Sequence, residues 1–507
     1  MNSNRKWRLF FIAILAAALI FIAAVMTMRE NKMCLGAEVV PAQYLQGRQE
    51  INVDLKDYIF FEDEKAAVDG DERIIYIPNQ IDEKTKPKDL KGKLSIALGE
   101  YELKFIRCDE MENLQQAVKD NRTFTLVAVS PQGYVKYDVI FSTLPVINIT
   151  SGEFMHMKNN REVWYGNMTV WAPYDESAGD FSTKTGRIKY NYRGGTTYFA
   201  AKKSYRISFI GGEGDKRNVN LLNLGEDDDW ILNGMTMDDM RVKEKVCMSL
   251  WNQHAQTTDY NYKMSQGEYA EVIADGKYRG LYMLQRRVDP KYLGLSDDDI
   301  LFKRSNVMTY ETAEEGYEIK NTPLTESETY AILNDVFYNG NLGIIDPDNL
   351  ADTNLFMEMG YMADNVQKNI YFVLRDTGDD YQLRFILWDT DMTFGIVWSP
   401  EGFIYNAQKA LKGASKRPET KPYAEINPQI YDLMAQKWAV LRSTVLTEEN
   451  ILAELDKCCA QLADSGAYIR ETDKWQCSSY GGLDTRENME SFICQKLQIM
   501  DEKYLQQ

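Results

Sequence analysis

The sequence predicts a mixed α+β fold, and three patterns along the chain support this. Residues 30 to about 140 alternate, or run apolar, over strand lengths between Gly, Asp and Asn turns. From there to about residue 415 strand-like and helix-like patterns mix, and the remainder has helical periodicity with charged outer faces. With 507 residues and 44% hydrophobic content, the chain is long enough for two or three domains with substantial cores.

The N-terminal segment is a targeting element and not part of the fold. Residues 9–28, "LFFIAILAAALIFIAAVMTM", are uncharged and long enough to span a bilayer. The following "MTMRENKMC" has no clear A-x-A cleavage site, and Cys34 lacks the preceding residues of a lipoprotein signal. We therefore expect an uncleaved transmembrane anchor, with a cleaved signal peptide as the alternative. Arg5, Lys6 and Arg8 should stay in the cytoplasm, which places the rest of the protein in an extracytoplasmic position at the cell membrane.

Composition shifts divide the chain into five parts. Residues 1–8 are a cytoplasmic stub and 9–28 the single-pass anchor. The short strands of residues 35–143 predict a small β-sandwich, an accessory domain for which the sequence indicates no role beyond spacing or packing. The segment "STLPVINIT" leads into a larger domain, residues 144–415, and residues 416–507 form its helical C-terminal part.

Charge and residue counts exclude several function classes. The chain has 58 basic and 76 acidic side chains, a formal charge of -18, and the acidic residues are spread along it. Nucleic acid is therefore not an expected partner, because phosphate binding needs a basic surface. With only His156 and His254 and no C-x-x-C pair, the chain has little material for a structural zinc site or a histidine-based triad. Any chemistry must use carboxylates, amides and lysines.

Four of the seven cysteines lie in the last 50 residues. In an exported protein some of these can form disulfides, whereas buried free thiols in helices are an equally supported alternative. The four are Cys458, Cys459, Cys477 and Cys494.

The first stretch with chemical content is "IKYNYRGGTTYFAAKKSYRISF". Two strand-like runs flank Gly194 and Gly195, where backbone N–H groups can approach an anion, and a nearby lysine would add positive charge for phosphate oxygens. Alternation along the second strand puts Lys202 and Lys203 on opposite faces, so only one of them is expected to point at a ligand. A plain hairpin with surface lysines is the alternative.

The second stretch is "YMADNVQKNIYFVLRDTGDDYQLRFILWDTDMTFG". Asp364 and Asn369 have the D-x-x-x-x-N spacing of a protein-kinase catalytic loop, in which the Asp orients the acceptor hydroxyl and the Asn binds a metal ion. The two strand-like runs predict a hairpin that returns Asp389 to the level of Asn369. Asp391 would share a second cation or cap the next turn. Taken singly, each acid also fits a turn or helix cap. Together they offer the hard oxygen ligands that Mg²⁺ prefers.

These segments resemble the spore-coat protein H (CotH) family of secreted, atypical protein kinases. The resemblance covers about residues 144 to 410. It is carried, in the family's order and spacing, by "YRGGTTYFAAKKSYRISF", "LLNLGEDDDWILNGMTMDDMRVKEKV", "AEVIADGKYRGLYMLQRRVD", "ADNVQKNIYF" and "LWDTDMTFG". It implies a two-lobed kinase-like fold, ATP with Mg²⁺ or Mn²⁺ as cofactor, and Ser or Thr hydroxyls of extracytoplasmic or spore-coat-type proteins as acceptors.

Carried over residue by residue, the resemblance assigns roles within this chain. Asp364 becomes the catalytic-loop residue, and Lys202 or Lys203 the lysine that contacts the nucleotide phosphates. The cofactor-binding turn is Arg193, Gly194 and Gly195; Asn369 and Asp389 become metal ligands, with Asp391 as a further candidate.

Three departures from the family pattern favour a second hypothesis. Gly195 replaces an amide side chain, Lys243 stands where the family has Arg, and Arg286 stands where it has Glu. An active exported kinase is the first interpretation, because the metal-site residues are retained. A binding or scaffolding surface protein that transfers phosphate poorly is the second, and a phosphotransferase acting on a small molecule or glycan is a third.

Overall fold

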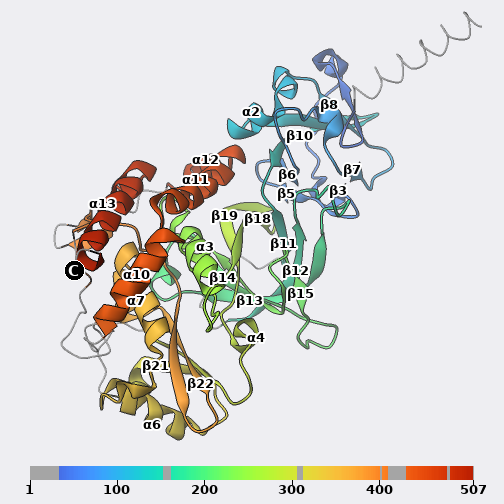
Figure 1. Ribbon diagram of the computed structural model, residues 1–507. Coiled ribbons are helices and arrows are strands. Elements are labelled where there is room, and N and C mark those ends of the chain that lie inside the picture. Colours follow the sequence, from blue (N-terminus) through green and yellow to red (C-terminus); the bar gives the residue numbers. More distant parts are fainter. Residues whose placement is uncertain are drawn as a thin grey trace, which may run out of the picture.

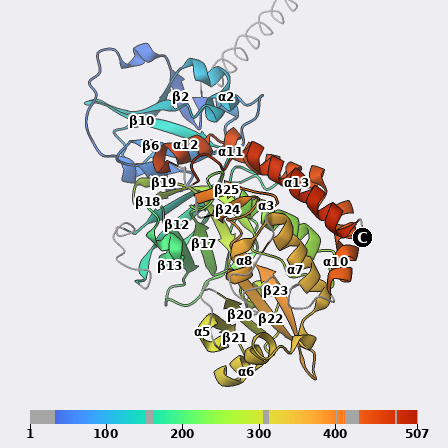
Figure 2. The ribbon, with the colours of Figure 1, turned by 90° about the vertical axis from the view of Figure 1, so that its left-hand side faces the viewer.

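The computed structural model describes residues 33–151, 162–304, 312–399, 402–408, 411, 430–476 and 480–505. It is a mixed α+β protein, as the sequence predicts. An N-terminal β unit lies at one end, a closed barrel lies in the middle, and an α+β unit lies at the other end, with four C-terminal helices along one side (Figures 1 and 2).

The N-terminal unit contains two sheets with one shared hydrophobic core. Buried residues of both sheets, such as Phe61 and Phe105, belong to this core. A short helix, α2 (Leu114–Lys119), begins at Asn113, whose side chain accepts from the Gln116 amide. In order across the larger sheet the strands are β1 (Met33–Cys34), β2 (Ala37–Val40), β8 (Glu102–Ile106), β9 (Phe124–Ser130), β10 (Gly133–Ser142), β6 (Ile74–Pro78) and β5 (Ala67–Asp69); the smaller sheet is β4 (Glu64–Lys65), β3 (Ile59–Phe61) and β7 (Leu94–Ile96).

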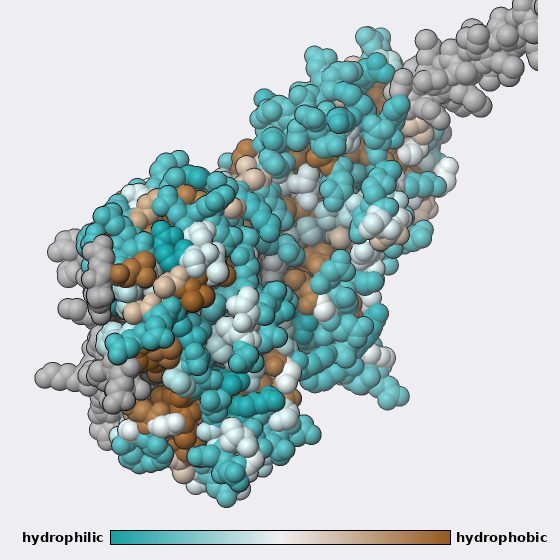
Figure 3. All heavy atoms as spheres, in the orientation of Figure 1, coloured by the Kyte–Doolittle hydropathy of each residue, from teal (hydrophilic) through white to brown (hydrophobic). Residues whose placement is uncertain are grey.

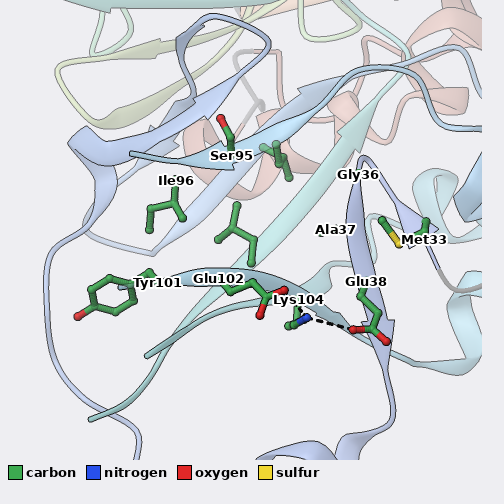
Figure 4. Close-up of a pocket in the computed structure, with 11 residues that line it drawn as sticks. Met33, Gly36, Ala37, Glu38, Ser95, Ile96, Tyr101, Glu102 and Lys104 are labelled. Atoms are coloured by element: carbon green, nitrogen blue, oxygen red, sulfur yellow. Dashed lines mark hydrogen bonds and ion pairs between the residues drawn. The ribbon is translucent and has the colours of Figure 1, made fainter. Parts of the chain in front are cut away.

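The structure does not confirm a sandwich of two antiparallel sheets in this unit. In the larger sheet β2 pairs with β8, and β6 with β10, in parallel. A hollow of 420 Å³ lies between β2, β7 and β8, where Lys104 reaches the carboxylates of Glu38 and Glu102 (Figure 4). None of the residues that the sequence assigns to catalysis or binding lines it.

The barrel closes because its first strand, β11, pairs in parallel with the last strand of the barrel order, β18. Its remaining strand pairs are antiparallel. Alternate side chains of β13, Ile188, Tyr190 and Tyr192, point into a separate buried core. In order around the barrel the strands are β11 (Val146–Thr150), β12 (Trp164–Trp171), β13 (Lys184–Arg193), β14 (Ser204–Phe209), β17 (Asp229–Asn233), β19 (Lys277–Arg286) and β18 (Gly267–Ala274). Helix α3 (Lys243–Ala255) packs outside, and β15 (Val219–Asn220) and β16 (Glu226–Asp227) form a small hairpin.

The α+β unit is a four-stranded antiparallel sheet with helices on it. The strand order is β21 (Tyr317–Asn321), β20 (Ile300–Arg304), β22 (Ile370–Asp376) and β23 (Tyr381–Leu387). Asp346 begins α7 because its side chain accepts from the Asp348 and Asn349 amides, and Arg384 of β23 pairs with the same carboxylate at 2.8 Å. The helices are α4 (Pro290–Leu293), α5 (Ala313–Gly316), α6 (Glu326–Phe337), α7 (Pro347–Gly360) and α8 (Ala363–Gln367); β24 (Ile396–Ser399) and β25 (Gly402–Tyr405) form a hairpin after the sheet.

The C-terminal helices join all three parts. They share one hydrophobic core with α3, α7 and the four-stranded sheet. Helix α12 lies against β19, between the barrel and the N-terminal unit (Figure 2), and its Arg470 bonds both Glu271 of the barrel and Asn121 of the N-terminal unit. The helices are α10 (Tyr431–Ser443), α11 (Glu448–Asp464), α12 (Ala467–Trp475) and α13 (Arg486–Tyr504).

Two expectations from the sequence concern segments at the limits of the described chain. The predicted anchor, residues 9–28, lies outside the described residues; within those ranges no helix has both the length and the apolar character needed to cross a membrane. Cys458, Cys459 and Cys494 are free thiols, and Cys477 lies outside the described residues.

The visible surface agrees with the acidic, polar composition. The face drawn in Figure 3 is mainly hydrophilic, with apolar side chains in scattered groups. Among the described residues Phe199 is the most exposed large apolar side chain, at 84% of its surface.

The core of the α+β unit depends on a cluster of aromatic rings, which yields a stability prediction. Phe372 is fully buried and contacts four rings among the described residues, and the Phe302 ring centroid is 4.9 Å away. Phe372→Ala should lower the free energy of unfolding by about 3–5 kcal/mol, because it leaves a cavity as well as losing apolar burial. Urea unfolding followed by tryptophan fluorescence measures this loss.

The matched control is Phe199→Ala. Because that ring is exposed, its removal should change the free energy of unfolding by no more than about 0.5 kcal/mol. Equal losses in the two variants would contradict the assignment of Phe372 to the core.

Candidate functional site

The hairpin predicted between Asn369 and Asp389 is present. Strands β22 and β23 pair antiparallel from Ile370 opposite Leu387 to Asp376 opposite Tyr381. The residues just before β22 and just after β23 therefore lie at the same end of the sheet.

A single amide side chain holds the two ends of this hairpin together. Asn365 Nδ2 donates to the carbonyl of Asn369 at 2.9 Å and to the carbonyl of Trp388 at 2.7 Å. Asn369 and Asp389 both have left-handed backbones, with φ of 56° and 58°. Asn and Asp tolerate this region better than other side chains, and such strained positions persist where surrounding contacts fix them. The structure thus fixes where both side chains leave the backbone.

Asp364 lies on the short helix α8, directly after α7. Its Oδ2 accepts from Asn369 Nδ2 at 2.7 Å and is 3.3 Å from Lys368 Nζ. The amide of Phe394 donates to the carbonyl of Gly360 at 2.7 Å, which ties the loop after β23 to the end of α7. Asp364, Asn369 and the acidic loop therefore form one connected group.

These residues face the barrel across a cleft of 670 Å³. All the site residues predicted from the sequence line this cleft except the two lysines. From the barrel and its loops come Arg193, Gly194, Gly195, Thr197, Ser204, Asn233, Thr236 and Met237; from the α+β unit come Lys303, Glu318, Asp364, Lys368, Asn369, Asp389, Asp391 and Met392.

The glycine-rich turn is a longer loop than the sequence predicts. Strands β13 and β14 pair from Arg193 opposite Ser204, so residues 194–203 form the connection, which includes a 3-10 turn at Thr196–Phe199. Gly194 has φ of 110°, a backbone conformation that side chains with a Cβ rarely adopt. The backbone conformation therefore favours glycine at 194.

Neither predicted lysine reaches the cleft lining. Lys202 is buried behind the barrel wall, where its Nζ donates to the Leu281 carbonyl and to Glu471 Oε1. Lys203 donates to the Tyr198 carbonyl and lies near the Tyr192 and Tyr198 rings. The sequence could not indicate this, because the carboxylate that binds Lys202 lies 269 residues further along the chain.

Two cationic residues of the cleft, Lys303 and Lys368, were not predicted from the sequence; Lys368 is paired with Asp364, whereas Lys303 lies nearer the barrel-side groups. Lys303 lines the cleft from β20 and lies 5.3 Å from the Tyr371 ring and 5.7 Å from the Trp388 ring. Arg193 stacks over the same Trp388 ring from the barrel side, at 5.6 Å. Burial lowers the pKa of Lys303 to about 8, although the charge of Asp389 opposes the shift. The sequence feature that could have indicated Lys303 is a lysine within the otherwise apolar strand-like run "ILFKR".

The acidic residues are crowded enough to raise one another's pKa. Burial, followed by the charge of Asp389, raises the pKa of Asp391 well above its usual value. Burial also raises the pKa of Asp364, with Lys368 opposing and Asp389 adding to the shift. Beneath the cleft wall, Glu244 accepts from Asn233 Nδ2 at 2.6 Å and from Gln285, and burial and the charge of Asp389 raise its pKa to about 8. A cation would relieve this repulsion.

The donor set fits a hard divalent cation that also binds phosphate. No three His, Cys, Asp or Glu side chains within the described ranges are arranged to hold a metal ion by themselves. The cleft offers Asp389, Asp391 and the amide of Asn369. Mg²⁺ is commonly held by one or two carboxylates, with water and substrate phosphates completing its shell.

Two of the three departures from the family pattern lie away from the cleft. Arg286 is buried against Asp227 at 2.7 Å and donates to the Leu224 carbonyl, and Lys243 is buried against Asp484 at 2.7 Å. Neither lines the cleft, whereas Gly195 does. The charge reversal at Arg286 is therefore compensated by a local partner.

Comparison with known proteins decides the family. The family model described as CotH kinase protein matches residues 190–500, more than half of the chain. The chain belongs to the CotH kinase family. The match begins within β13 and extends into α13, so it includes both sides of the cleft and the C-terminal helices. Membership in the CotH kinase family implies a kinase-like function. Among curated proteins, none matches the chain at a significant level.

The raised pKa of Glu244 predicts a pH effect on stability. Between 4.5, its ordinary value, and about 8 the folded chain retains a proton that the unfolded chain has lost. Stability therefore falls as the pH rises through this window. Glu244→Gln removes this titration, so the variant should melt at a higher temperature than wild type at about pH 8.5 and close to wild type at about pH 4.

Thermal unfolding across this pH range provides the measurement. Glu318→Gln, which replaces an exposed acid of the same cleft, should keep the wild-type pH dependence. If Glu244→Gln also keeps it, the carboxyl is not protonated in the folded chain.

Proposed function

We propose that this protein is an atypical kinase that transfers the γ-phosphoryl group of ATP to Ser or Thr hydroxyls of extracytoplasmic proteins. The observation that carries the proposal is the cleft itself. One side presents Arg193 and the glycine-rich loop, and the other presents Asp364, Asn369 and Asp389. This is the set of groups that phosphoryl transfer requires: phosphate binding, metal ligands and a residue that orients the acceptor.

The nucleotide phosphates would bind between the glycine-rich loop and the hairpin end. Gly194 and Gly195 leave the loop backbone accessible, and Arg193 and Lys303 supply positive charge near Trp388. Charge-assisted hydrogen bonds from such groups are roughly twice as strong as neutral ones. In this proposal Lys303 has the role that the family resemblance assigned to Lys202 or Lys203.

Asn369, Asp389 and Asp391 would hold Mg²⁺ or Mn²⁺ together with the phosphates. A bound divalent ion neutralises charge on the transferring phosphoryl group. The side chains also repel one another less when that charge is present, which agrees with the raised pKa of Asp391.

Asp364 would accept the proton of the attacking hydroxyl and orient it. Its Oδ2 contacts both Asn369 Nδ2 and Lys368 Nζ, so the position of the carboxylate is defined before substrate binds. Burial raises its pKa, which brings it nearer to that of an effective general base.

The proposed location is the cell membrane, with the catalytic part extracytoplasmic. The apolar run of residues 9–28 and the basic residues before it support this placement. Mass measurement of protein isolated from membranes tests it, since cleavage near Cys34 would give a shorter chain.

Replacement of Asp389, Asp364 and Asp391 should affect nucleotide binding and phosphorylation rate differently. Asp389→Ala should abolish Mg²⁺-dependent ATP binding and phosphorylation, because the metal ligand is lost. Asp364→Asn should keep nucleotide affinity and lose rate by about 10²–10⁴-fold, the usual contribution of a positioned general base. Asp391→Ala should lie between these variants if the side chain touches a second cation, and near wild type if it only caps the loop.

Calorimetric titration with a non-hydrolysable ATP analogue measures binding, and transfer from γ-labelled ATP, first to the protein itself, measures rate. Asp376→Ala, at the other end of the same hairpin, is the matched control and should behave as wild type. Full activity in Asp389→Ala would show that the hairpin end is structural and would favour the scaffold interpretation.

The positions of Lys303 and Lys203 relative to the cleft predict which of these two lysines binds phosphate. Lys303→Met should raise the dissociation constant for ATP with Mg²⁺ about tenfold or more, since a hydrogen bond to a charged group is lost. Lys203→Met should leave it unchanged, because Lys203 points to the Tyr198 carbonyl. The same calorimetric titration decides between them, and the reverse ranking would contradict the assignment of Lys303.

A further inference from the structure

The loop between β17 and α3 forms part of the cleft wall on the barrel side. Asn233, Thr236 and Met237 line the cleft opposite the hairpin end. Within this loop, residues 234–242, Met235 and Arg241 have left-handed backbones, with φ of 52° and 64°. Residues with Cβ atoms hold such conformations only where surrounding contacts fix them. The contacts that hold this loop come from α12 and from the segment before α13.

Glu471 of α12 is the first of these contacts. Its carboxylate is fully buried. Oε1 accepts from Lys202 Nζ at 2.6 Å and from Arg241 Nε at 3.1 Å, and Oε2 accepts from the Leu281 amide at 2.9 Å. Arg241 in turn donates from Nη1 to the carbonyls of Met235 and Asp238. The buried carboxylate of Glu471 thus positions the Arg241 guanidinium, which in turn binds two carbonyls of the loop.

The segment before α13 supplies the second contact. Asp484 is 2.7 Å from Lys243 Nζ, and its Oδ2 accepts from the Asp239 amide at 3.0 Å. The Tyr480 hydroxyl donates to the carbonyl of Met237 at 2.7 Å, which is the carbonyl of a cleft-lining residue. Tyr468 of α12 donates to the Asp239 carbonyl at 2.9 Å.

Both carboxylates act from behind the wall. Neither Glu471 nor Asp484 lines the cleft, and both are buried, so buried partners such as Arg241 and Lys243 balance their charges. In a buried setting, removing one partner of an ion pair leaves the other charge uncompensated. The loop conformation therefore depends on these two acids, and with it the positions of Asn233, Thr236 and Met237.

We propose that Glu471 and Asp484 are positioning residues for nucleotide binding, which act by holding the 234–242 loop as a wall of the cleft. The proposal rests on the kinase function proposed above. It makes the C-terminal helical part a component of the nucleotide site, and it gives Lys202 a structural role within that component.

Glu471→Gln in the full-length chain tests the proposal, because it removes the charge and keeps the size of the side chain. The matched control is Arg470→Gln, the preceding residue of α12. Arg470 is also buried and paired, with Glu271, Asn121 and the Ser465 carbonyl as its partners, and it has no hydrogen bond to the loop among the contacts in the described part of the chain.

Two measurements are made on both variants in detergent solution: amide hydrogen exchange of peptides covering residues 234–242, and calorimetric binding of an ATP analogue with Mg²⁺. Glu471→Gln should speed exchange in these peptides and raise the dissociation constant about tenfold, the size of loss found when residues that orient metal ligands are replaced. Arg470→Gln should lower the melting temperature without either effect. Asp484→Asn should repeat the Glu471→Gln result.

The outcomes are distinct. Equal effects of Glu471→Gln and Arg470→Gln on exchange and binding would show general destabilisation and overturn the proposal. If Glu471→Gln speeds exchange but leaves ATP-analogue binding unchanged, the proposal is also overturned. The same holds if Glu471→Gln leaves exchange unchanged. If the wild-type chain binds no ATP analogue at all, the proposed kinase function fails, whereas the exchange measurement still decides whether Glu471 holds the loop.

Discussion

The two hydrogen bonds from the Asn365 side chain are the constraint on which the candidate site depends. They join the carbonyls of Asn369 and Trp388 and so close the open end of a hairpin whose other end is a turn. Closure sets the left-handed backbones of Asn369 and Asp389 side by side. An amide with two fixed carbonyl partners specifies position more sharply than apolar packing does, because hydrogen bonds depend on direction.

The distribution of charge in the cleft is compatible with the anionic nucleotide proposed as substrate, although the protein as a whole is acidic. The cleft places Asp364, Asp389 and Asp391 on one side, and this crowding is unfavourable unless cations share it. Arg193 and Lys303 both lie near the Trp388 ring and supply part of that charge. The reduced pKa of Lys303 shows that keeping it charged in this place costs solvation, and a bound phosphate would offset that cost.

The peripheral parts of the chain differ in how they relate to the cleft. The C-terminal helices reach the back of its wall through Glu471 and Asp484. The N-terminal unit packs on the far end of the barrel, where its core continues into Trp171 and Tyr278, and α12 contacts both. It is thus linked to the barrel by a continuous core, and its own hollow lies apart from the residues assigned to catalysis.

The amino-acid sequence by itself determined the α+β class, the hairpin and the grouping of Asp364, Asn369 and Asp389. These follow from local patterns: strand periodicity sets a hairpin, and a hairpin brings its two ends together whatever surrounds it. The family likewise followed from ordered motifs, and the match over residues 190–500 confirms it.

Tertiary structure alone decided which cation faces the cleft and what holds its wall. Lys202 and Lys203 follow the glycine-rich turn and so were predicted, in place of Lys303, to contact phosphate. Instead, a carboxylate 269 residues away binds Lys202, and a carbonyl binds Lys203. Lys303 lies at the cleft because β20 pairs beside β22, a register that no local pattern encodes. The parallel strand pairs of the N-terminal unit were missed for the same reason. Long-range pairing is chosen by which surfaces bury one another, and short stretches of sequence do not contain that information.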